Sequence, residues 1–149
     1  MKQKFGLLCI CICIILYVIF SASHTSKIYT DRTGALFEMR YPSTIMPRSI
    51  HSGDFYTVYF EEDIVVASAP KIHTLPIDPT GVITDHIQID GHKATVVKTR
   101  LPDGQLSDGY KILFQTNTRL YRLFILRPDR AGGYLESFKV LPEHDTIAR

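Results

Sequence analysis

The sequence predicts a small α+β domain, a twisted antiparallel β-sheet built from hairpins with one or two short helices, preceded by an N-terminal hydrophobic helix. Three observations lead to this class. Residues 110–126 and 85–101 each alternate in polarity on both sides of a short turn, and a continuous apolar run occupies residues 5–20. Hydrophobic residues make up 45% of the chain and charged residues 21%, which is typical of a folded protein.

Residues 1–23 form a predicted export segment. Lys2 and Lys4 precede the apolar run, and Ser21-Ala22-Ser23 supplies the small residues that a signal peptidase requires. Two interpretations remain open. Cleavage after Ser23 would make residues 1–23 a signal peptide, whereas an uncleaved run of sixteen residues, about 24 Å long as a helix, would be a signal anchor. The Ile-rich composition favours the anchor, and both interpretations place the rest of the chain outside the cytoplasm.

Cysteines occur only inside the apolar run, at Cys9, Cys11 and Cys13. Each is preceded by a bulky residue, which argues against a lipoprotein site, and cysteine in such a run behaves as a small hydrophobe. The exported part has no cysteine, so we expect its own core to stabilise it without disulfides.

The charge balance argues against nucleic-acid binding. The 17 basic residues exceed the 15 acidic ones only because of Lys2 and Lys4, so residues 24–149 are neutral overall. A nucleic-acid-binding domain would carry a concentrated basic surplus.

The central element of the predicted sheet is the hairpin over residues 110–126. A two-residue turn at Asn117-Thr118 pairs Thr116 with Arg119, and strand parity then places six large side chains on one face. These are Tyr110, Ile112, Phe114, Tyr121, Leu123 and Ile125. The other face carries a mixed set of polar and apolar residues.

Further strands are predicted on both sides of this hairpin. Residues 35–42 alternate, with Phe37, Met39 and Tyr41 inward, and Asp90-Gly91 centres a hairpin over residues 85–101. Strands are also expected at 55–60 and 64–69, joined by a solvated acidic turn at 61–63. Residues 24–33 are expected to be a tether, 43–54 a loop with at most one helical turn and 101–109 a turn-rich loop. Residues 130–136 are expected to form a short turn or helix, 137–141 a last strand or helix end, and 142–149 a tail.

Two surfaces are candidates for partner binding. The Pro- and Gly-rich crossing over residues 70–83 is long, and long loops in compact domains are often functional. One side of the central hairpin is expected to present basic side chains to an acidic partner or to anionic headgroups. The candidate contact residues are Lys111, Arg119, Arg122, Tyr56, His73, Leu75 and Ile77.

No catalytic or metal-binding motif is recognisable. The exported part lacks a nucleophilic cysteine, a Gly-x-Ser-x-Gly elbow and a glycine-rich phosphate loop, and His86 and His92 fall on opposite faces of their hairpin. We therefore predict a non-enzymatic protein without a cofactor, metal or small-molecule ligand. Converging carboxylates of a small periplasmic hydrolase are an alternative that the sequence leaves open.

Three segments resemble the PsbP-like superfamily, which includes exported bacterial lipoproteins of the DcrB kind. They are Phe37-Glu38-Met39-Arg40-Tyr41-Pro42, Ile89-Asp90-Gly91-His92-Lys93-Ala94 and Leu135-Glu136-Ser137-Phe138-Lys139-Val140, and the likeness spans roughly residues 34–141. This chain departs from the family pattern in having no tryptophan after Tyr41-Pro42 and no clear helix over residues 70–83. The resemblance implies a non-enzymatic adaptor or assembly factor.

These observations predict an exported domain over residues 34–141 that is held at the outer side of the cytoplasmic membrane. Its expected role is that of an accessory or assembly subunit of an envelope complex, binding a protein partner. The alternative is a soluble secreted effector or inhibitor, released by cleavage after Ser23.

Overall fold

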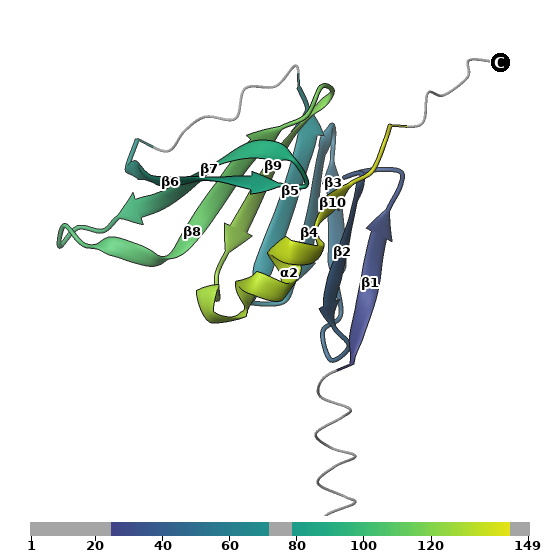
Figure 1. Ribbon diagram of the computed structural model, residues 1–149, viewed down its shortest axis with the longest axis horizontal. Helices are drawn as coiled ribbons and strands as arrows, with labels where there is room; N and C mark the ends of the chain where they lie inside the picture. The colour runs from purple at the N-terminus through teal and green to yellow at the C-terminus, as the bar shows by residue number, and fades with distance from the viewer. Residues whose placement is uncertain (1–24, 72–78, 144–149) are drawn as a thin grey trace, which may run out of the picture.

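A computed structural model describes residues 25–71 and 79–143. It contains two antiparallel sheets and one short helical segment (Figure 1). The small sheet has the order β1-β2-β10 and consists of β1 (Ser26–Asp31), β2 (Phe37–Pro42) and β10 (Lys139–Val140). The antiparallel sheet predicted from the sequence is therefore confirmed, and strands outweigh helix in the described chain.

The large sheet has seven strands in the order β3-β4-β5-β9-β8-β7-β6. The strands are β3 (Arg48–Ser52), β4 (Phe55–Phe60), β5 (Ile64–Pro70), β6 (Gly81–Ile89), β7 (His92–Arg100), β8 (Leu106–Gln115) and β9 (Arg119–Ile125). A 3-10 turn, η1 (Pro128–Arg130), leads into helix α2 (Ala131–Ser137). Among the described residues no helix is long and apolar enough to span a bilayer.

The central hairpin has the predicted register. Phe114 pairs with Tyr121, Ile112 with Leu123, and the amide of Thr116 donates to the carbonyl of Arg119 at 2.9 Å. Strand β9 is the middle strand of the large sheet. The β6–β7 hairpin also turns at Asp90-Gly91 as predicted, where the positive φ values of both residues fit a tight turn.

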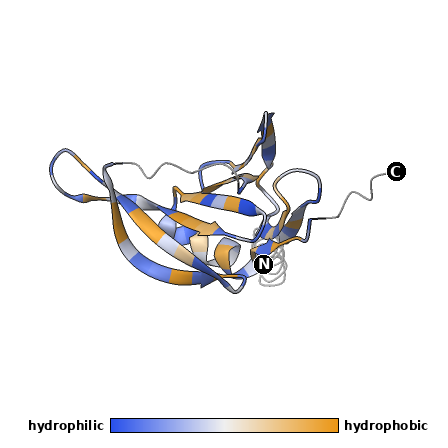
Figure 2. Cartoon of the chain, turned by 90° about the horizontal axis from the view of Figure 1, so that it is seen from above, coloured by the Kyte–Doolittle hydropathy of each residue, from blue (hydrophilic) through white to orange (hydrophobic). Residues whose placement is uncertain are grey.

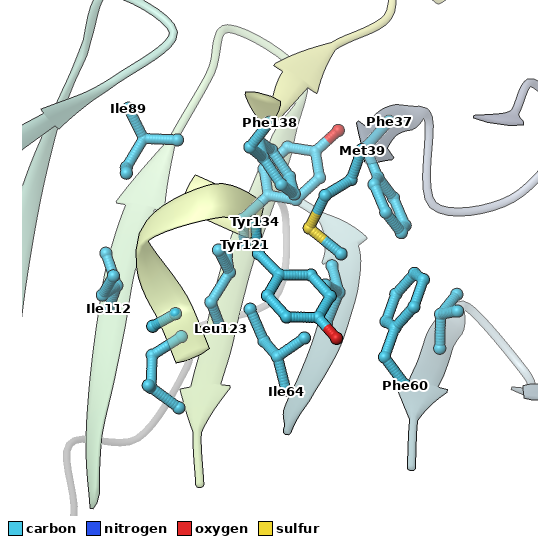
Figure 3. Packing of buried hydrophobic residues seen from close by; sticks show 14 of the residues in the cluster. Phe37, Met39, Phe60, Ile64, Ile89, Ile112, Tyr121, Leu123, Tyr134 and Phe138 are labelled. Atoms are coloured by element: carbon cyan, nitrogen blue, oxygen red, sulfur yellow. The ribbon is translucent and has the colours of Figure 1, made fainter. Parts of the chain in front are cut away.

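The core lies between the inner face of the large sheet and a layer formed by α2 and the small sheet (Figure 3). Inner-facing residues of β4, β5, β8 and β9 meet Phe37 and Met39 of β2 and Tyr134 of α2. Phe37 stacks on Phe138 at 5.2 Å between ring centroids, and Phe114 stacks on Tyr121 at 4.9 Å. Seen from above, the large sheet bends around α2, and apolar and polar residues alternate along its strands (Figure 2).

Leu36 connects the two layers. Its φ of 55° lies in the left-handed region, and its carbonyl accepts hydrogen bonds from the hydroxyl of Tyr121 (3.0 Å) and the amide of Leu141 (2.9 Å). Burial raises the pKa of Tyr121 to about 12, so this hydroxyl stays protonated near neutral pH. The two hydrogen bonds hold Leu36 in a conformation that a non-glycine residue seldom adopts.

Two segments predicted to lack regular structure are strands. The expected tether contains β1, which pairs with all of β2 from Ser26–Pro42 to Asp31–Phe37, so the domain starts before residue 34. The expected loop over residues 43–54 contains β3, which pairs with β4 through a two-residue turn at Gly53-Asp54. Both are edge strands with mostly exposed side chains. Because neither strand buries one full face, its sequence lacks the alternation of apolar and polar residues that predicts a strand.

Two turns also differ from expectation. Strand β8 begins at Leu106, inside the stretch predicted to be a loop over residues 101–109. The acidic turn at 61–63 is only partly solvated, because Asp63 is buried. Its carboxylate accepts a hydrogen bond from the hydroxyl of Tyr134 at 2.8 Å, and its backbone carbonyl accepts bonds from the amides of Leu126 and Arg127.

Candidate functional site

The outer face of the large sheet is the side turned away from α2 and the small sheet. The strand ladders define two rows of side chains that cross it completely. The first row is Arg48, Tyr59, Val65, Phe124, Lys111, Val97 and Ile83. The second row is Ile50, Thr57, Ala67, Arg122, Leu113, Thr95 and His86.

These two rows are rich in exposed or half-buried apolar groups. Ile50 is 50% exposed and Tyr59 37%, and Phe55 next to them on β4 is 46% exposed, while Ile83 at the opposite edge on β6 is 55% exposed. Large exposed apolar side chains grouped on neighbouring strands, as on β3 and β4, are characteristic of interaction surfaces. Six inter-strand spacings of about 4.8 Å make each row about 29 Å long.

The charge on this face has one sign. The formally charged side chains in the two rows are Arg48, Lys111 and Arg122, all basic, and neither row contains a carboxylate. The Nζ of Lys111 lies 6.0 Å from the ring centroid of Phe124, and the guanidinium carbon of Arg122 lies 5.6 Å from it. The aromatic ring thus holds two cations close together at the centre of the sheet.

Arg119 does not belong to this face, so the prediction that Lys111, Arg119 and Arg122 share one side is wrong. Strand parity puts Arg119 with Tyr121 on the inner side, where it is only 6% exposed. Its Nε donates to the hydroxyl of Ser68 at 2.8 Å, and its Nη1 lies 3.8 Å from Glu143. Its Nη2 is buried and has no hydrogen-bond partner among the described residues.

Tyr56 also lies on the inner side of the sheet. Its ring stacks on His51 at 4.2 Å, and the guanidinium of Arg119 lies 5.5 Å from its centroid. A Cβ at Gly34 would come within 2.2 Å of this ring, so glycine is required there by the close approach. Tyr56 therefore packs the corner between β4 and the start of β2, and is not available on the outer face.

The remaining predicted contact residues, His73, Leu75 and Ile77, lie outside the described residues. The described ends of that crossing are Lys71, whose amide donates to the carbonyl of Thr118 at 2.8 Å, and Thr80, whose carbonyl accepts from the amide of Arg100 at 2.9 Å. These two bonds fix where the crossing leaves β5 and joins β6.

A groove of about 630 Å³ lies between the small sheet and α2, a volume in the range of ligand pockets. Its lining mixes Arg40, Arg130 and Lys139 with Glu38 and Glu136. It contains the serine next to Glu136, but this Ser137 is engaged in structure. Its hydroxyl lies 2.8 Å from the carbonyl of Gly133 and accepts a hydrogen bond from the amide of Arg40 at 2.9 Å.

The groove borders a buried polar pair formed by Asp63 and Tyr134. Burial and the hydrogen bond to the carboxylate of Asp63 raise the pKa of Tyr134. Arg130 lies 3.5 Å from the same carboxylate. A protonated phenol and an arginine that both hold one buried carboxylate form a structural link between the β4–β5 turn and α2. Within residues 25–71 and 79–143, no three His, Cys, Asp or Glu side chains gather in a way that could hold a metal ion.

Sequence reasoning missed Arg48, Ile50 and Tyr59 as members of the outer face. Arg48 and Ile50 were hidden because their segment was interpreted as a loop. The signal that could have found them is Gly53-Asp54, a two-residue turn type that joins antiparallel strands. Pairing from that turn would have placed Arg48 opposite Tyr59 and Ile50 opposite Thr57.

Comparisons with protein-family models, with curated proteins and with solved structures find no match for this chain.

Proposed function

We propose that the protein is a non-enzymatic binding module, tethered to the outer side of the cytoplasmic membrane by its N-terminal segment. It serves as an accessory or assembly subunit of a cell-envelope complex. The outer face of the large sheet contacts a protein partner that presents apolar side chains rimmed by carboxylates. The likeness of three segments to PsbP-like domains supports the same style of function.

The observation that carries this proposal is the composition of the two outer rows. They combine exposed apolar side chains with Arg48, Lys111 and Arg122, and they contain no acidic residue. Apolar area supplies the binding energy of such an interface, while charges of one sign select the partner and speed its association. An acidic partner therefore fits this face best.

The test is affinity purification of the full-length protein from solubilised membranes, comparing wild type with the double variant Lys111→Glu/Arg122→Glu. We expect a co-purifying protein that is lost from the double variant, because two carboxylates would then face the carboxylates of the partner. Lys139→Glu is the matched control, since Lys139 is an exposed lysine on β10, away from the outer face. Equal capture by all three proteins would contradict the proposed contact surface.

A soluble secreted effector or inhibitor is the second candidate, favoured by the small residues Ser21 and Ser23 at a suitable cleavage point. Membrane fractionation separates the two candidates. An unprocessed chain that stays in the membrane pellet in high salt supports the tethered subunit. A shortened chain in the soluble fraction supports the secreted effector.

A further inference from the structure

One end of the molecule, here called the basal end, gathers four segments around the start of β1 (Figure 1). The amide of Ser43 donates to the carbonyl of Thr25 at 2.9 Å, and the amide of Met46 lies 3.4 Å from a carboxylate oxygen of Glu61. The amide of Leu126 donates to the carbonyl of Asp63 at 3.0 Å. The basal end therefore consists of Thr25 and residues 43–46, 61–63 and 126–130.

Two large apolar side chains project from the basal end. Met46 is 79% exposed and Leu126 is 50% exposed. The charges around them carry no basic surplus. Arg127 lies 3.5 Å from Asp129 and Arg130 lies 3.5 Å from Asp63, while Glu61 and Glu62 add two acids to these two ion pairs. A surface with protruding apolar groups and no basic surplus suits the zwitterionic boundary of a bilayer better than a strongly anionic one.

The sequence before Thr25 fixes how far this end can lie from a membrane. The apolar run ends at Phe20, and four residues separate it from Thr25. Four residues span at most about 14 Å even when fully extended. An anchor formed by the apolar run therefore keeps the basal end close to the headgroup region.

We propose that the basal end rests on the outer surface of the bilayer, with Met46 and Leu126 inserted at the boundary between headgroups and acyl chains. This inference rests on the proposed membrane tether and adds an orientation to it. The strands of the large sheet then stand away from the membrane, and the outer face is presented sideways to a partner in the same membrane.

The chain contains no tryptophan, so single tryptophans can report the position of each site. Full-length Met46→Trp and Leu126→Trp variants are reconstituted into phosphatidylcholine vesicles with and without brominated acyl chains. We expect bromine to reduce the emission of both variants about twofold or more, because an inserted indole lies about 5–10 Å deep, within reach of the acyl chains. Raising the salt concentration should leave this quenching unchanged, since apolar contact and not charge holds the basal end.

Phe55→Trp is the matched control. Phe55 is 46% exposed and starts β4, whereas the other end of β4 leads into the basal end. Five residue steps separate Phe55 from Phe60, which places it about 17 Å farther from the bilayer. Its emission should not respond to bromine, and circular dichroism verifies that all three variants fold like wild type.

The outcomes distinguish this inference from the tether itself. Protein that floats with the vesicles while Met46→Trp and Leu126→Trp remain unquenched overturns the proposed orientation and leaves the tether intact. Protein that does not float with vesicles overturns the tether. Quenching of Phe55→Trp equal to that of Met46→Trp would mean that the sheet lies flat on the bilayer, and this also overturns the orientation.

Discussion

At the scale of single residues, Arg119 combines burial with incomplete hydrogen bonding. Burying a donor without a partner costs about 1–3 kcal/mol, and Nη2 of Arg119 is such a donor among the described residues. The ion pair with Glu143 offsets little of this cost, because the Glu143 side chain is 49% exposed and the pair is 3.8 Å long. The guanidinium carbon of Arg119 also lies 5.5 Å from the ring centroid of Tyr56, a cation–π contact, and the apolar stem of this buried side chain adds packing area.

We therefore expect Arg119→Met to change the free energy of unfolding by less than about 1 kcal/mol, because methionine keeps the apolar stem and removes the unpaired donor. Arg119→Ala should cost about 2 kcal/mol or more, because it also removes the apolar stem of a buried side chain and leaves a cavity. Urea unfolding followed by circular dichroism measures both values. A methionine variant as unstable as the alanine variant would show that the bond to Ser68 dominates.

Asp31 gives a second prediction at this scale. Burial by itself would raise the pKa of Asp31, but its carboxylate accepts hydrogen bonds from the amides of Gly34, Ala35 and Thr33, and these hold the pKa below its ordinary value. The carboxylate thus ends β1 and fixes the turn toward β2. A lowered pKa means that the folded state prefers the charged form.

The contribution of Asp31 should be fully present above the unfolded-state pKa of about 3.9 and lost as the pH falls through the lower folded-state pKa. We expect Asp31→Asn to reduce stability by about 1 kcal/mol near neutral pH and by clearly less near pH 3. Urea midpoints of both proteins at the two pH values test this. A difference that does not shrink in acid would assign the loss to geometry instead of charge.

At the scale of elements, the central hairpin should dominate stability. Phe114→Ala and Leu123→Ala remove buried side chains from β8 and β9, and each should cost about 2–5 kcal/mol. His86→Ala, at an exposed position of β6, should cost less than about 0.5 kcal/mol. Chemical unfolding of the three variants checks the assignment of faces, and similar losses at all three positions would contradict it.

The elements that could be predicted from the sequence are those with one buried face. Apolar and polar residues alternate along β8 and β9 because the inner side chains of these strands enter the core. Asp90-Gly91 predicts the turn between β6 and β7. β3 has no buried residue, so its side chains carry no period of two and its strand character comes only from backbone pairing with β4. β1 was missed for the same reason, since it pairs along one edge of β2 and is mostly exposed.

At the scale of the whole molecule, the candidate site was only partly predictable. Lys111 and Arg122 could be placed on the outer face from strand parity alone. The same parity puts Arg119 on the face of Tyr121, and the interpretation that joined all three overlooked it. The approach of Tyr56 to Gly34 and the burial of Asp63 under Tyr134 depend on contacts between distant segments, which no local pattern encodes.

The two surfaces of the whole molecule should respond differently to salt. Binding of an acidic partner through Arg48, Lys111 and Arg122 should weaken as the ionic strength rises, because exposed charges are screened over about 10 Å at 0.1 M salt. Attachment to the membrane should persist under the same conditions. Immunoblots of the captured partner and of the membrane pellet across a salt series measure partner binding and membrane attachment. Partner capture that does not depend on salt would show that these cations do not contribute to the interface.

The first described strand has a consequence for how this protein could leave a membrane. Shedding of surface proteins ordinarily proceeds by proteolysis of an unstructured stalk, which releases the ectodomain intact. Here residues 26–31 form a pairing strand of the small sheet, and the ring of Tyr29 packs against the buried Phe37 and meets Phe60 edge to face. A protease that cuts within these residues would remove part of the fold, so release of an intact domain would require cleavage before Ser26.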